Sequence, residues 1–320
     1  MKRKVLLQLV VPLLSLCVLF LLLTMDPMGP SQPQELLEIS VIFRQSDAAT
    51  WSVARQGMEQ AALDLNAELR FLTPAGEDLA AEQRELLERE AASGTDAILL
   101  IPSDREALAE PVKNVTSAGT PVVTLETDMT DAGAAACIGA DNIALGEALG
   151  NAALNGAPEG SLVVLLDTAA GATGVTDRME AAQAVLEAAG RQVTCCRPLD
   201  GEPLSDALAR MLLVARPAAV IAFDAADLEQ AAALLAERTD APLLYGAGST
   251  AAVAAYLEQS TIVSIAAQNE FAAGYLAVGA AVQAAEGQQT FSIDPLAFFL
   301  VRQENMYQPE NQKLLFPVTR

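Results

Sequence analysis

Histidine is absent from this chain of 320 residues, and other residues that support enzyme and metal chemistry are scarce. Without histidine there can be no Ser-His-Asp or Cys-His catalysis, no imidazole metal ligand and no histidine pH switch. The cysteines (Cys17, Cys137, Cys195 and Cys196) include no C-x-x-C pair, so nothing supports a zinc or redox motif. The composition therefore predicts neither a cofactor nor a metal site.

Basic residues are also few, since 19 Lys and Arg stand against 41 Asp and Glu, giving a formal net charge of −22. A field of that sign repels nucleic acid and anionic lipid surfaces, so we expect no nucleic-acid partner. The sequence contains no phosphate loop, no G-x-S-x-G elbow and no dinucleotide fingerprint. These absences argue against an enzyme.

The longest uncharged run spans residues 5–23 and follows Lys2, Arg3 and Lys4. A helix of that length covers roughly 28 Å, close to the hydrocarbon thickness of a bilayer. The basic residues favour a cytoplasmic N-terminus, and no small-x-small cleavage site follows the run. We predict a transmembrane signal anchor over residues 1–25, which places the remaining chain outside the cytoplasm, in the cell envelope. A cleaved signal and a lipoprotein anchored through Cys17 are the alternatives.

After a Pro-rich linker over residues 26–37, apolar strands alternate with amphipathic helices. Five strands are predicted in each of two cycles: 39–43, 69–72, 97–101, 121–125 and 136–139, then 161–166, 192–196, 219–223, 243–245 and 262–267. Uninterrupted apolar strands between helices are typical of parallel sheets covered on both faces. The pattern predicts an α/β fold of two doubly wound parallel-sheet lobes, with an eight-stranded barrel as the alternative.

Cys195 and Cys196 are adjacent on one predicted strand, so their side chains should point to opposite faces. A bond between them would be strained. We interpret them as small strand residues, and a disulfide from Cys137 to one of them is the alternative.

Polar residues follow the predicted strands at their carboxyl ends, where open α/β sheets bind ligands. The residues at these positions that we predict to contact a ligand are Arg44, Asp47, Glu126, Asp128, Asp224, Ser249 and Gln268. Two residues of the helices that follow the first and sixth strands, Trp51 and Arg178, complete the predicted set. Hydroxyl groups of a small polar ligand need paired donors and acceptors, and an apolar ring face packs on an aromatic side chain.

In the order and spacing of its segments, the chain resembles the type 1 periplasmic binding proteins, specifically the ribose/galactose-binding group. The resemblance covers residues 38–305. It is carried by Gly94-Thr-Asp-Ala-Ile-Leu-Leu-Ile-Pro102, Gly119-Thr-Pro-Val-Val-Thr-Leu125, Ile138-Gly-Ala-Asp-Asn142, Asp177-Arg-Met-Glu180, Ala215-Arg-Pro-Ala-Ala-Val-Ile-Ala-Phe223 and the segment from Gln268 to Tyr275.

The resemblance implies two lobes joined by three crossovers, near residues 139–140, 268–269 and 294–296. The N-terminal lobe would comprise residues 38–139 plus 269–294. The C-terminal lobe would comprise residues 140–268 plus 295–305, and residues 306–320 would form a C-terminal tail.

The resemblance also implies roles for particular residues. Trp51 stands where the family often has a stacking aromatic residue, Glu126 where it has a ligand-binding Asp, and Gln268 matches the hinge glutamine. Other ligand positions of the family are changed, because Thr127, Ala226 and Gly248 stand where Arg, Asn and Asp are usual. The implied ligand is a sugar or another sugar-like small polar molecule.

Members of this family deliver solutes to ABC importers, so the resemblance implies an ABC permease as the partner. A receptor subunit that signals to a membrane histidine kinase or chemoreceptor is the alternative. A hydrolase that uses carboxylates such as Glu126 and Asp128 is a minor alternative.

Overall fold

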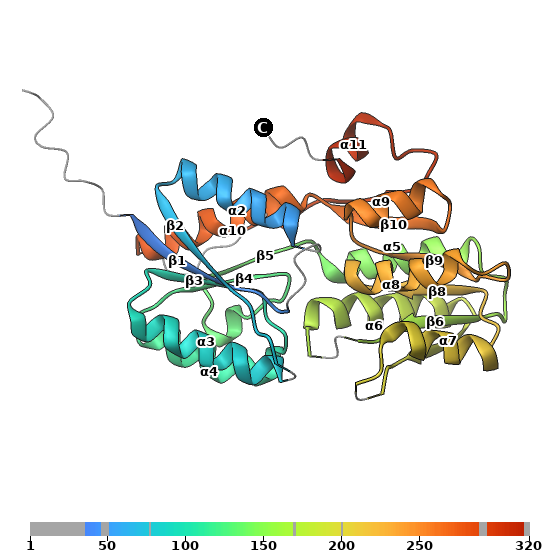
Figure 1. The fold of residues 1–320 in the computed structure, drawn as a ribbon, viewed down its shortest axis with the longest axis horizontal. Coiled ribbons are helices and arrows are strands. Elements are labelled where there is room, and N and C mark those ends of the chain that lie inside the picture. Colours follow the sequence, from blue (N-terminus) through green and yellow to red (C-terminus); the bar gives the residue numbers. More distant parts are fainter. Residues whose placement is uncertain are drawn as a thin grey trace, which may run out of the picture. The chain divides into compact units, whose positions relative to one another are not determined.

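Two sheets with helices on both faces form the part of the chain that this computed structural model describes (Figure 1). The described residues are 36–45, 51–76, 78–168, 171–199, 201–287 and 293–316. Residues 37–320 form one unit, and the predicted anchor over residues 1–25 lies outside the described residues. Among the described helices, none is long and apolar enough to cross a membrane.

The first sheet contains β1 (Leu37–Ile42), β2 (Ala67–Leu72), β3 (Ala97–Leu100), β4 (Val122–Leu125) and β5 (Ala136–Ile138). Its strand order is β2-β1-β3-β4-β5, and all neighbours are parallel. One face is covered by α2 (Ser52–Asp64) and α10 (Glu270–Ala285), the other by α3 (Leu79–Ser93) and α4 (Arg105–Ser117). Because both faces are covered, β3 and β4 consist of buried residues throughout.

The second sheet contains β6 (Leu162–Leu166), β7 (Gln192–Cys196), β8 (Ala219–Ala222), β9 (Leu243–Ala247), β10 (Ile262–Gln268) and β11 (Phe298–Val301). Its order is β7-β6-β8-β9-β10-β11, which repeats the order of the first sheet and adds β11 antiparallel to β10. The helices α5 (Asn142–Leu154) and α6 (Thr173–Ala188) cover one face. The opposite face carries α7 (Leu204–Val214), α8 (Ala225–Ala236), α9 (Ala251–Glu258) and α11 (Pro309–Leu315).

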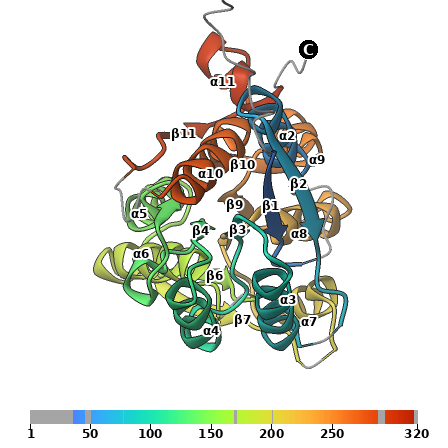
Figure 2. The same ribbon diagram turned by 90° about the vertical axis from the view of Figure 1, so that its left-hand side faces the viewer.

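The chain passes between the two sheets more than once. It leaves the first sheet after β5, and α10 returns to pack beside α2, as both ribbon views show (Figures 1 and 2). Leu296 donates its N–H to the Gly139 carbonyl at 2.9 Å and forms a bridge with Ala140, so two of the passages lie side by side. The two-lobed α/β fold is therefore confirmed, and the barrel alternative is wrong. The residue limits of each lobe stay a prediction.

The structure also decides two local questions. Cys137, Cys195 and Cys196 are free, which excludes the disulfide alternative among these three. Cys195 is exposed and Cys196 is buried, as alternation along β7 predicts.

The segment predicted to be a C-terminal tail contains the helix α11. Three of its residues, Met306, Leu314 and Leu315, are buried in the core of the second lobe, so α11 and the turn before it pack against that lobe.

Candidate functional site

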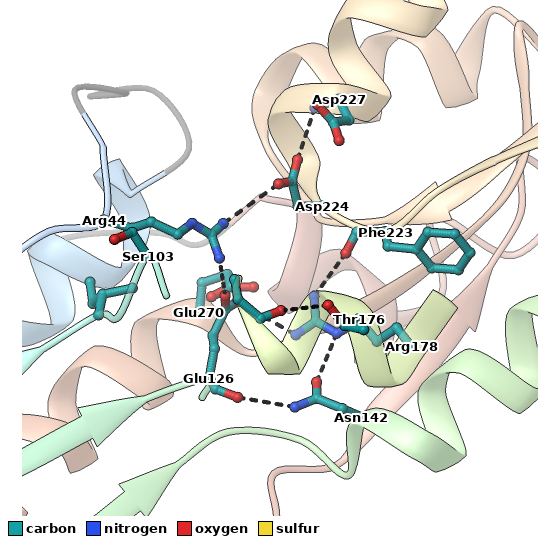
Figure 3. A network of polar contacts seen from close by, with 12 residues as sticks. Arg44, Ser103, Glu126, Asn142, Thr176, Arg178, Phe223, Asp224, Asp227 and Glu270 are labelled. Carbon is teal, nitrogen blue, oxygen red and sulfur yellow. Dashed lines mark hydrogen bonds and ion pairs between the residues drawn. The ribbon is translucent and has the colours of Figure 1, made fainter. Parts of the chain in front are cut away.

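Each sheet has a switch point where strand order reverses, between β1 and β3 in the first sheet and between β6 and β8 in the second. Open α/β sheets bind ligands in the crevice at such points. Arg44 follows β1 and Asp224 follows β8, so each comes from a switch point. Their side chains meet, with Arg44 Nη2 lying 3.5 Å from Asp224 Oδ2 (Figure 3).

Glu126 lies between two arginines at the centre of this site. Its Oε2 is 3.7 Å from Arg44 Nη1, and its Oε1 is 3.6 Å from Arg178 Nη2. Glu126 follows β4 of the first lobe, whereas Arg178 belongs to α6 of the second. The Glu126–Arg178 pair therefore crosses from one lobe to the other, as the Arg44–Asp224 pair does.

The backbone at Glu126 is held in a conformation that non-glycine residues rarely adopt, with φ of 67°. Its carbonyl accepts a hydrogen bond from Asn142 Nδ2 at 3.0 Å. Such strain persists only when surrounding structure fixes it, and it concentrates at functional sites. Here it directs the carboxylate between the two arginines.

Arg178 is buried, and each of its three guanidinium nitrogens contacts a protein group. Its Nε donates to Asn142 Oδ1 at 2.7 Å and its Nη1 donates to the Phe223 carbonyl at 3.0 Å, while Nη2 faces Glu126. These contacts make Arg178 an anchor for the cleft and leave it little capacity to bind an anion.

A cavity lies against this network, and its empty space, counted together with the solvent at its open side, is about 580 Å³. Its apolar lining includes Val53, Leu145, Ala225, Ala247 and Ala266. Its polar lining is Arg44, Trp51, Glu126, Arg178, Asp224, Ser249, Thr250, Gln268 and Glu270.

Two buried polar atoms of the cavity lining have no hydrogen-bond partner among the described residues. They are the indole Nε1 of Trp51 and the amide Oε1 of Gln268, on side chains that are only 4% and 5% exposed. A buried donor or acceptor without a partner costs free energy, so native structures rarely leave one unmatched. One donor and one acceptor without a partner therefore belong to residues that line the cavity. Trp51 also faces the Arg44 guanidinium, 5.8 Å from its ring centroid.

Asp224 and Asp227 form a second group of carboxyls beside the cavity. Asp224 caps α8 by accepting the Asp227 N–H at 2.9 Å, which leaves its Oδ2 for Arg44. Asp227 is buried behind it and accepts a hydrogen bond from the Thr168 hydroxyl. Burial, and next the charge of Asp224, raise the pKa of Asp227.

Glu270 is a residue of the cavity that the sequence analysis did not select. It begins α10, and its Oε1 accepts a hydrogen bond from Gln268 Nε2 at 3.1 Å. Burial, and next the charge of Glu126, raise the pKa of Glu270 to about 7. Its position just after the carboxyl end of β10 is the sequence signal that could have identified it.

Seven of the predicted contact residues line the cavity together: Arg44, Trp51, Glu126, Arg178, Asp224, Ser249 and Gln268. Asp128 is exposed and is not part of the lining; its carbonyl accepts from Arg105 Nε at 3.0 Å and its Oδ1 from the Thr130 N–H at 2.8 Å. Glu126 and Asp128 are therefore not brought together in the cavity, as the hydrolase alternative would need. Asp47 lies outside the described residues.

Comparison with known proteins agrees with this fold. Residues 39–289 match the family described as "Periplasmic binding protein domain". The ribose import binding protein RbsB of Escherichia coli K12 is 31% identical over 107 residues, which cover 33% of this chain and 36% of that protein. The chain is thus aligned with only about a third of the length of this curated relative.

Solved structures share the fold over most of their length. A carbohydrate transporter solute-binding protein from Agrobacterium radiobacter, in complex with D-arabinose, is 19% identical with a TM-score of 0.81. That match covers 88% of this chain and 99% of the other. A chain from the XylFII–LytSN complex is 16% identical with a TM-score of 0.74, covering 84% of this chain and 98% of that one.

Proposed function

The chain belongs to the periplasmic binding protein family, and from that premise we propose that it is an extracytoplasmic solute receptor tethered to the membrane. Its two lobes enclose a small polar, sugar-like ligand, and the closed form is presented to an ABC importer. Hinge closure of this kind is one of the common ways in which proteins respond to ligands.

The observation that carries this proposal is the pair of unpartnered atoms in the cavity, Trp51 Nε1 and Gln268 Oε1. A ligand with several polar groups can serve both atoms, because a hydroxyl oxygen accepts from an indole and a hydroxyl hydrogen is donated to an amide oxygen. The indole face offers the apolar surface on which a sugar ring packs. The D-arabinose complex of the Agrobacterium protein gives the ligand class its precedent.

The first test uses the sole tryptophan of the chain as its own reporter. A bound ligand should change the fluorescence of Trp51 and raise the melting temperature by mass action. Pentoses, hexoses, polyols and nucleosides are screened by both methods with the purified chain. If no compound changes either signal, the proposed function is wrong.

The variant Trp51→Phe keeps an aromatic wall and removes the indole N–H. We expect it to weaken binding of a hit compound by about fivefold to thirtyfold, the effect of one lost hydrogen bond from a buried site. Calorimetric titration measures the change. The matched control Phe71→Leu alters an aromatic residue outside the cavity lining and should leave the affinity unchanged.

Membrane tethering is tested by fractionation. The full chain should stay with membranes after carbonate extraction, and a chain that lacks residues 1–25 should not. Release of the full chain by carbonate would argue for a cleaved signal, whereas incorporation of labelled lipid at Cys17 would favour the lipoprotein alternative.

A second candidate is a receptor subunit that passes lobe closure to a membrane histidine kinase or chemoreceptor. The similarity to a chain from the XylFII–LytSN complex favours it, because that fold occurs there with a second protein. Loss of the gene separates the two candidates: an importer receptor is needed for solute uptake, and a sensor subunit is needed for the response to the solute.

A further inference from the structure

We propose that the ligand carries a protonated amine as well as hydroxyl groups, and that Glu270 receives this amine. This inference rests on the proposed solute-receptor function and specifies the chemical class of its ligand. It follows from the charges that face the cavity and from which of them are already paired.

The charged lining residues comprise two cations and three carboxyls. Arg44 and Arg178 are the cations, and Glu126, Asp224 and Glu270 are the carboxyls. Glu126 is shared by both arginines, and Asp224 pairs with Arg44. The arginines are therefore used by the protein itself, and the cavity presents no spare cation to an anionic ligand.

Glu270 is the third carboxyl of the lining, and it takes no part in these ion pairs. Among the described residues, none places a Lys or Arg nitrogen within 4.0 Å of it; its printed partner is the uncharged amide of Gln268. Glu126 faces it from the end of β4 and Arg178 faces it from α6. Glu270 is half-buried beside the cavity. A carboxylate that is partly removed from water is stabilised by a nearby cation, and without one its protonated form is favoured.

Gln268, which contacts Glu270, offers an acceptor that the same protonated amine can use. Gln268 donates its amide N–H to Glu270, and its own Oε1 is buried without a partner among the described residues. An ammonium group has three donors, enough for both Glu270 and Gln268 Oε1. Trp51 Nε1 remains for an oxygen atom of the same ligand. The site is thus complementary to a ligand with an amine near Glu270 and an oxygen acceptor near Trp51.

The field of the whole chain acts in the same direction. A formal net charge of −22 draws small cations toward the protein. A neutral polyol would leave Glu270 without a counter-charge, so the carboxyl would keep its proton. An ammonium ligand would replace that proton, and binding would release it to solvent.

The experiment compares each neutral compound with its amine counterpart: galactose with galactosamine, glucose with glucosamine, and sorbitol with 1-amino-1-deoxysorbitol. Calorimetric titration of the full chain at pH 6.5 gives the affinities. Repeating it in buffers of different ionisation enthalpy gives the protons released. We expect the amine to bind about tenfold or more tightly in at least one pair, as a charge-assisted hydrogen bond implies, with release of a proton.

The variant Glu270→Gln should remove both the preference for the amine and the proton release. The control Glu147→Gln, an exposed residue of α5, should change neither. If Glu270→Gln does not fold, proton release by the unmodified chain still decides. Neutral compounds binding as tightly as amines, or amines binding without proton release, would overturn this inference and leave the proposed function standing. Failure of both kinds of compound would overturn both.

Discussion

At the scale of single residues, Glu126 balances the charge of the cleft because both Arg44 and Arg178 lie against it. Replacing it by Gln leaves two buried guanidinium groups with too few carboxylates. Breaking a buried ion pair from one side is strongly destabilising. We expect Glu126→Gln to lower the free energy of unfolding by about 3 kcal/mol, measured by urea denaturation.

The control for this variant is Glu59→Gln. Glu59 pairs with Arg55 at 2.9 Å on the surface of α2, where both side chains are half-exposed. An exposed pair of this kind contributes about 0.5 kcal/mol or less. Equal losses for Glu59→Gln and Glu126→Gln would show that the cleft network does not stabilise the fold.

Glu270 gives a prediction for the pH dependence of the ligand-free protein. Its pKa is raised from 4.5 to about 7 in the folded state. Below pH 4.5 the carboxyl is protonated whether the chain is folded or not. As pH rises toward 7, the unfolded chain loses this proton while the folded chain still holds it, so stability falls through this window.

We therefore expect the free energy of unfolding of Glu270→Gln to exceed that of the unmodified chain more at pH 8 than at pH 5. Urea denaturation at both pH values measures this difference. Comparing two proteins removes the contribution of Asp227, whose pKa is also raised. A difference that is the same at both pH values would mean that Glu270 titrates normally in the folded chain.

Candidate site residues could be predicted where a strand end fixes their place. Arg44, Asp224 and Gln268 lie at or directly after the ends of β1, β8 and β10, and all three line the cavity. The position of Asp128 could not be predicted from the strand end. The backbone at Glu126, two residues earlier, is in the left-handed region, so the chain does not continue in the direction of β4. Glu270 was missed because its role depends on the charges around it, which come from other segments of the chain.

At the scale of secondary-structure elements, α2 and α10 approach so closely that glycines are required at their contact. A Cβ on Gly274 would lie 1.9 Å from the Ala54 carbonyl oxygen, and one on Gly57 would lie 2.0 Å from that of Phe271. Alanine favours a helix over glycine, yet the backbone of the partner helix cannot yield this space. We expect Gly274→Ala to lower the free energy of unfolding by at least about 2 kcal/mol.

The same helix supplies the matched control. A Cβ on Gly279 would meet only Leu65 Cδ1 at 3.9 Å, an ordinary contact. Gly279→Ala should therefore stabilise the protein by about 0.5–1 kcal/mol through helix propensity. Thermal and urea denaturation of both variants measure the contrast. Similar stability of the two variants would mean that α2 and α10 do not pack this closely.

Elements could be predicted wherever an apolar strand or a long periodic helix was present. The strand predicted over residues 192–196 coincides with β7. The short α11 was not predicted, because it has only 7 residues and its sequence is largely polar. It is stabilised by burial of Leu314 and Leu315 on the second lobe, a contact that local sequence does not reveal.

At the scale of the whole two-lobed unit, Asp224 joins the lobes by pairing with Arg44. Another contact between the lobes is the backbone hydrogen bond from the Arg105 N–H to the Gly171 carbonyl at 2.8 Å. Asp224 also caps α8, and asparagine caps a helix as well as aspartate does. The variant Asp224→Asn therefore removes the charge of this contact and keeps the helix start intact.

Without that charge, Arg44 keeps only Glu126 as an anionic partner among the described residues, and the contact between the lobes weakens. We expect the ligand-free Asp224→Asn variant to have a larger radius of gyration than the unmodified chain by small-angle X-ray scattering. The control Asp78→Asn changes the cap of α3, which accepts from the Ala81 N–H far from the cavity lining, and should not alter it. An unchanged radius for Asp224→Asn would mean that the remaining contacts, including the Glu126–Arg178 pair, hold the lobes together without it. A larger radius with an unchanged melting temperature would instead assign Asp224 to lobe closure rather than to folding, because each lobe keeps its own buried core.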